Sequence, residues 1–114
     1  MSEFATLFYL LAAHALCDYP LQGDWLSRAK NPTLSLVPGE VIWPGALLCH
    51  ALIHAAAVQI ITGSWVFAGV ELVVHAGTDY AKCRGSFGYN TDQIVHVLTK
   101  VAFFAALGFF GPVA

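Results

Sequence analysis

The sequence has few charged residues. They make up 11% of its 114 residues, whereas a soluble domain of ordinary composition has about 25%. Hydrophobic residues make up 58%. A chain so poor in charge cannot cover a water-exposed surface, so the composition excludes an ordinary soluble domain and predicts an integral membrane protein.

Basic runs and cysteine motifs are also missing. The net charge is only -2 and no Lys/Arg cluster is interleaved with aromatic residues, which excludes a nucleic-acid-binding protein. The three cysteines are odd in number and have no CxxC spacing, which excludes a disulfide framework and a zinc knuckle. The N-terminus has no basic region of a secretory signal, so we expect the first apolar segment to be retained.

Long apolar segments are what the sequence does contain. They cover residues 3–19, 43–62, 64–82 and 91–110, and each approaches the ~20 residues that a helix needs to cross a bilayer. Backbone groups in lipid must be hydrogen-bonded within their own segment, so these segments should be helical. We predict one all-α domain, 1–114, an integral membrane four-helix bundle with a long loop at 20–42.

Shorter signals refine this fold. The loop segment "GDWLSRAK" predicts an interfacial helix capped by Asp24, and Asn90 or Thr91 is expected to cap the fourth long helix. "HALCDY" at 14–19 and "HAGTDY" at 75–80 match at four of six positions. Each is followed by a segment with a second spaced pair, which suggests two helical hairpins related by a pseudo-twofold axis.

The basic residues predict the orientation. Arg28, Lys30, Lys82 and Arg84 all fall on connections, or on a helix end, at one side of the predicted bundle. The positive-inside rule places this side in the cytoplasm. We therefore expect a multi-pass protein of the bacterial inner membrane with both termini in the periplasm.

Ionisable residues collect near the same side. Because successive helices alternate in direction, all four bring their His and Asp residues to the cytoplasmic half, and each His has a His or Asp partner four residues away on the same helix face. Such pairs on neighbouring helices can hold a metal ion. The candidate ligands are His14, Asp18, His50, His54, His75, Asp79, Asp92 and His96.

Imidazole and carboxylate ligands without thiolate suit zinc first, or else manganese, iron or nickel. Four ligands usually satisfy one zinc ion, so eight candidates imply either two ions or ligands supported by the remaining residues. We expect the side chains of Gln22, Gln93 and Lys100 to support the ligands without binding the ion.

Glu71 lies one turn deeper than His75 and Lys100 one turn deeper than His96, so a buried ion pair is expected. A catalytic role is the alternative for Glu71. Lys82, with Arg84 and Lys30 nearby, is a candidate for holding a substrate phosphate, and its alternative is a snorkelling charge that sets the orientation.

The succession HxxxDYxLQ, HxxxH, HxxxDxxK and DQxxH resembles a family of small uncharacterised bacterial and phage membrane proteins over nearly the whole chain. More distantly, it is similar to LexA-regulated inner-membrane proteins described as metal-dependent hydrolases. The resemblance implies functional roles for the eight candidate ligands and for Gln22, Lys82 and Gln93.

Three functions remain open at this point. The first is a membrane-embedded metal-dependent hydrolase of a lipid or amphiphilic phosphoester at the cytoplasmic face. The second is a non-catalytic, metal-stabilised membrane protein of phage or prophage type, and the third is a small oligomeric ion or proton conductor. An open groove favours the first, a closed site with four protein ligands the second, and a continuous polar path the third.

Overall fold

The computed structural model describes residues 3–111, which contain five α-helices and no strand. The predicted all-α class is confirmed. The bounds of the four long helices lie within two residues of the predicted segments. The helices are α1 (Glu3–Asp18), α2 (Gly23–Ala29), α3 (Trp43–Thr62), α4 (Trp65–Cys83) and α5 (Tyr89–Phe110).

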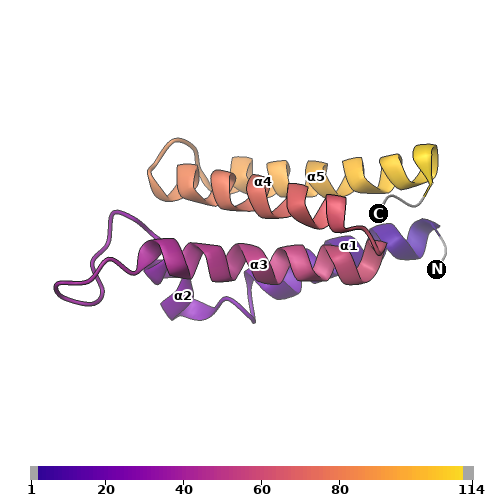
Figure 1. Ribbon diagram of the computed structural model, residues 1–114. Coiled ribbons are helices and arrows are strands. Elements are labelled where there is room, and N and C mark those ends of the chain that lie inside the picture. The colour runs from indigo at the N-terminus through magenta and orange to yellow at the C-terminus, as the bar shows by residue number, and fades with distance from the viewer. Residues whose placement is uncertain (1–2, 112–114) are drawn as a thin grey trace.

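The four long helices lie side by side along one axis, with α1 and α3 in one layer and α4 and α5 in the other (Figure 1). Each contacts two neighbours, because α3 packs against α1 and α4, and α5 packs against α4 and α1. The molecule measures 48 × 23 × 21 Å. The first residue of α1 and the last of α5 lie at one end, and the loops 30–42 and 84–88 lie at the other (Figure 1), which we call the loop end.

Local sequence explains where the helices stop. Tyr19 precedes Pro20, and the residue before a proline disfavours helical geometry, so α1 ends at Asp18, one residue earlier than predicted. Gly63 ends α3 with a left-handed φ of 72°, a conformation that glycine adopts without strain. The Ser64 side chain then accepts a hydrogen bond from the Phe67 N–H at 3.0 Å and caps α4.

Two predicted helix caps are wrong. Asp24 lies inside α2, whose N-cap is Gln22, and it pairs with Arg28 four residues later at 3.0 Å. The fourth long helix begins earlier than predicted because Gly88 supplies the extended cap residue, and its carbonyl accepts the first helical hydrogen bond. Asn90 and Thr91 are therefore already helical.

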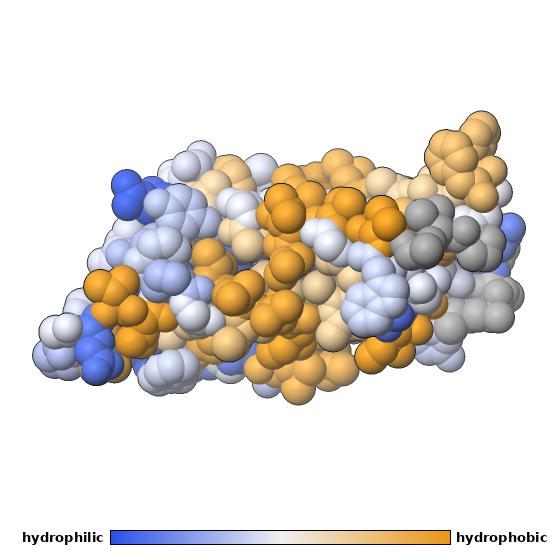
Figure 2. Space-filling model, viewed as in Figure 1, coloured by the Kyte–Doolittle hydropathy of each residue, from blue (hydrophilic) through white to orange (hydrophobic). Residues whose placement is uncertain are grey.

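Polar and apolar side chains are distributed in reverse of a soluble protein. The buried polar and charged residues are about as numerous as the buried apolar ones, whose compact cluster is formed by Leu10, Val58, Phe67 and Phe103. Large apolar side chains are exposed along every long helix. Figure 2 shows an apolar band across the middle of one face, with the most hydrophilic residues at its ends.

Two helices, α3 and α5, are long and apolar enough to cross a membrane. Taken together, α1 and α2 also meet this length and composition, but they meet at a bend of 81°. α4 carries Glu71, Asp79 and Lys82, which lower its mean hydropathy. These features are compatible with a membrane protein.

Candidate metal centre

All four long helices contribute histidine or aspartate to one buried cluster in the interior of the bundle. The i,i+4 spacing stacks each helix's pair on its inner face, and all five histidines are buried. The imidazole rings pack on one another: those of His54 and His75 are 3.7 Å apart between centroids, and those of His75 and His96 are 4.1 Å apart. Among the eight predicted ligands only Asp18 is not fully buried, with 11% of its side chain exposed.

The larger set of ligand atoms comes from Asp18, His50, His54 and His75, and we call it the outer group. Asp18 Oδ1 lies 2.9 Å from His54 Nε2, 3.2 Å from His50 Nε2 and 3.7 Å from His75 Nε2. The Nε2 atoms of His50 and His75 face each other at 3.1 Å. Three imidazoles and a carboxylate thus direct their ligand atoms at one small volume.

These distances fit a single ion. In a tetrahedral site with metal–ligand distances of about 2.1 Å, neighbouring ligand atoms are about 3.4 Å apart. Four of the six separations among the ligand atoms of the outer group, from 2.9 to 3.7 Å, bracket that value, and all six lie within 4.8 Å. The outer group therefore has the ligand number, ligand type and spacing for one ion.

Behind the outer group, a buried ion pair supports His75. The Glu71 Oε1 atom lies 3.2 Å from His75 Nδ1 and 2.7 Å from Lys100 Nζ, and all three side chains are almost fully buried. The expected pairing of Glu71 with Lys100 is present. A carboxylate on the far nitrogen of a histidine is the usual support for a metal ligand, because it fixes the tautomer and the orientation of the ring.

A second set of ligand atoms, the inner group, is formed by Glu71, His75 and His96. Within the described chain, Glu71 Oε2 and His96 Nδ1 are buried without a hydrogen-bond partner. The inner group shares His75 with the outer group, and the ammonium of Lys100 already compensates the charge of Glu71. These two features favour one ion in the outer group over a pair of ions.

His14 lies beside the outer group without belonging to it. Its Nε2 atom is 3.0 Å from Gln93 Oε1, and the Gln93 amide donates to Asp18 Oδ2 at 3.0 Å. Gln93 thereby bridges a histidine and a ligand carboxylate across two helices. It occupies the position expected of an amide that orients a ligand.

Asp79 and Asp92 pair with lysines and belong to neither ligand group. The Lys30 ammonium donates to Asp79 Oδ2 at 2.5 Å. Lys82 lies 3.5 Å from Asp79 and 3.4 Å from Asp92, whose other oxygen is 3.2 Å from His96 Nε2. Both aspartates were predicted ligands, and the structure places them around the site as partners of cations.

Lys30 is the residue whose position sequence reasoning missed. It lies directly after α2, only 2% of it is exposed, and its ammonium also contacts the Gln22 side chain, which in turn donates to the Asp18 carbonyl at 3.1 Å. The segment 22–30 is thus pinned against the cluster. A buried aspartate in an apolar helix requires a cation nearby. This requirement for Asp79 is the sequence feature that could have predicted a buried Lys30.

The chain was compared with known proteins. The family described as "Protein of unknown function (DUF3307)" matches residues 6–111, a range that contains every residue of both ligand groups. This match confirms the predicted resemblance to an uncharacterised family, and its description mentions neither a hydrolase nor a phage. No curated protein and no solved structure matches the chain.

Proposed function

Because the chain belongs to the DUF3307 family, whose function is unknown, we propose a function from the geometry of the cluster: a membrane-embedded protein that binds one divalent transition metal ion. Asp18, His50, His54 and His75 would hold the ion. The observation that carries this proposal is the convergence of four ligand atoms within 4.8 Å of one another, with four of their six separations between 2.9 and 3.7 Å.

The membrane placement is supported by the reversed distribution of side chains. Apolar residues cover the outside while charged residues fill the interior, and the length of 48 Å matches the ~40–45 Å thickness of a bilayer with its headgroups. We take the four long helices as a membrane bundle in the bacterial inner membrane, surrounded by lipid. Arg28, Lys82 and Arg84 at the loop end favour a cytoplasmic loop end and periplasmic termini.

Zinc suits the outer group best. Structural zinc sites are tetrahedral, are made of protein ligands only and are closed to water, whereas manganese prefers six oxygen ligands. His50, His54 and His75 are at most 1% exposed. A closed site with four protein ligands favours the second of the functions set out above, in which the ion stabilises the bundle and is not catalytic.

Hydrolysis is the second candidate, and the partial exposure of Asp18 favours it. A divalent ion supplies Lewis-acid chemistry that activates water near neutral pH and polarises a phosphoryl oxygen. Lys82, with 27% of its side chain exposed, lies next to Asp79 and Asp92 and would hold the phosphate of a lipid or amphiphilic phosphoester. Glu71 is fully buried between His75 and Lys100, where it orients a ligand.

Elemental mass spectrometry of protein purified from membranes tests the proposal. We expect one equivalent of zinc per chain, lost in His54→Ala and kept in the control Asp24→Ala, whose exposed carboxylate lies outside both ligand groups. A wild-type preparation that is folded without metal would contradict it. Release of phosphate or phosphorylated headgroup from lipid vesicles by the wild type, but not by His54→Ala, would select the hydrolase over the stabilising ion.

A further inference from the structure

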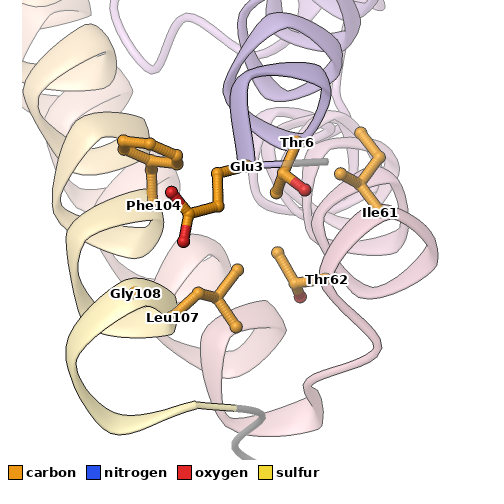
Figure 3. A pocket seen from close by; sticks show the side chains of 7 residues that line it. All are labelled: Glu3, Thr6, Ile61, Thr62, Phe104, Leu107 and Gly108. Atoms are coloured by element: carbon orange, nitrogen blue, oxygen red, sulfur yellow. The ribbon is translucent and has the colours of Figure 1, made fainter. Parts of the chain in front are cut away.

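A cavity of about 350 Å³ opens at the end of the bundle opposite the loop end. Its volume falls within the range of small-molecule sites, about 300–1,000 Å³. Figure 3 shows the Glu3 carboxylate inside it, near Phe104 and Leu107 of α5, with Thr6, Ile61 and Thr62 on the other side. The cavity is thus of mixed polarity, with one carboxylate and two threonines among apolar side chains.

Glu3 has no cationic side chain nearby. Of the five Lys and Arg residues, four lie at or near the loop end and the fifth, Lys100, is paired with Glu71. All five histidines belong to the buried cluster or its surroundings. Within residues 3–111 no ion pair of Glu3 is found, and its side chain is exposed, so a cationic ligand can reach the carboxylate.

An apolar groove adjoins this cavity. It has a volume of about 320 Å³, lies between α1 and α3, and shares Ile61 with the cavity. Ala12 and Ala13 leave it hollow between the larger side chains of Tyr9 and Leu16. At 1.5 Å per residue, Tyr9 and Leu16 lie about 9 and 20 Å from Glu3 along α1, so the groove extends over about 11 Å of a leaflet that is ~15 Å deep.

We propose that the cavity and the groove together bind a phospholipid whose headgroup carries a primary ammonium. The ammonium would bind the Glu3 carboxylate beside the Phe104 ring, which offers a π face to a cation. One acyl chain would lie in the groove between α1 and α3. This site rests on the membrane placement proposed above but is independent of the metal ion.

The charge and shape of the cavity select the headgroup. A trimethylammonium headgroup has no N–H to donate to a carboxylate, and an anionic glycerol headgroup would be repelled by Glu3. A primary ammonium satisfies the carboxylate by both charge and hydrogen bonding. The acyl chain adds affinity through apolar burial that does not discriminate between headgroups.

Native mass spectrometry of the purified full chain tests this site. The protein is mixed with phosphatidylethanolamine, phosphatidylcholine or phosphatidylglycerol of identical acyl chains. We expect the wild type to retain the ethanolamine lipid in preference by about two- to fivefold, which is the effect of one exposed ion pair. Glu3→Gln should abolish the preference, while Asp24→Asn, which removes an exposed carboxylate at the other end, should keep it.

A second variant tests the groove. Ala12→Leu fills the hollow from the lipid-facing side and should weaken all three lipids alike, because it removes the space for the acyl chain. Equal binding of the three headgroups by the wild type, or an unchanged preference in Glu3→Gln, would overturn the proposal. Zinc content measured on the same Glu3→Gln sample should equal that of the wild type, so failure of the lipid site and failure of the metal site are distinguished.

Discussion

The buried pair of Glu71 and Lys100 gives the sharpest test of how the interior is held together. Replacement of Lys100 by Met keeps an unbranched side chain of nearly the same length but leaves the Glu71 charge without its cationic partner at 2.7 Å. Both residues are at most 1% exposed. Breaking a buried ion pair by removing one partner typically costs about 3–5 kcal/mol, because the remaining charge is uncompensated.

The double variant Glu71→Gln/Lys100→Met separates the charge from the packing. It removes both charges, and replacing a whole buried pair by neutral groups is often neutral for stability or stabilising. We therefore expect the double variant to recover most of the stability lost in Lys100→Met. Its metal affinity should still fall about 10–100-fold, because a neutral amide in place of the Glu71 carboxylate would support His75 less strongly.

The assay is unfolding of the purified protein in detergent, followed by circular dichroism, with zinc content measured on the same samples. Differences among wild type, the single variants Glu71→Gln and Lys100→Met, and the double variant form a double-mutant cycle. The reasoning would be refuted if Lys100→Met were as stable as the wild type, or if the double variant were less stable than both single variants. A rise from one to two zinc ions in Lys100→Met would support the view that Lys100 restricts the cluster to one ion, and an unchanged content of one ion would contradict that view.

Three further outcomes follow from the structure. Lys30→Met should cost up to about 3–5 kcal/mol, because the buried Asp79 loses its nearest cation and keeps only Lys82 at 3.5 Å. It should also expose segment 22–30 to limited proteolysis, whereas no change in either measurement would contradict the pinned segment. Gln93→Leu should lower zinc affinity about 10–100-fold in a chelator competition by removing the hydrogen bond to Asp18, and unchanged affinity would show that Gln93 does not orient this ligand. A reporter enzyme fused to the C-terminus should be active only in the periplasm, and cytoplasmic activity would reverse the proposed orientation.

The helices were predictable because each is an apolar segment ended by a local signal, such as Gly63 after α3 or Pro20 after α1. Spacing by four residues also predicted which side chains share the interior. Spacing could not predict which of these side chains contact one another. Glu71 and Asp79 are each four residues from His75, and only the packing of the helices decides which carboxylate contacts the His75 ring. The structure gives that contact to Glu71.

The contacts of Lys30 lay beyond sequence reasoning for a different reason. They depend on the 81° bend between α1 and α2 and on the path of an irregular loop, and neither follows from hydrophobic periodicity. The predicted helix caps at Asp24 and Asn90 were wrong by a few residues. Asp24 pairs with Arg28 inside α2, and Gly88 supplies the N-cap of α5.

The turn at Gly63 and Ser64 bears on how the chain enters the bilayer during synthesis. α4 carries Glu71, Asp79 and Lys82, and a charged residue near the centre of an inserting helix costs about 2.5–3.5 kcal/mol on the insertion scale of the translocon. Alone, α4 would be a poor substrate for the insertion machinery. In the proposed membrane placement, a two-residue turn joins α4 to the strongly apolar α3, so the two helices would enter the bilayer together as a hairpin in which α3 offsets the cost of α4.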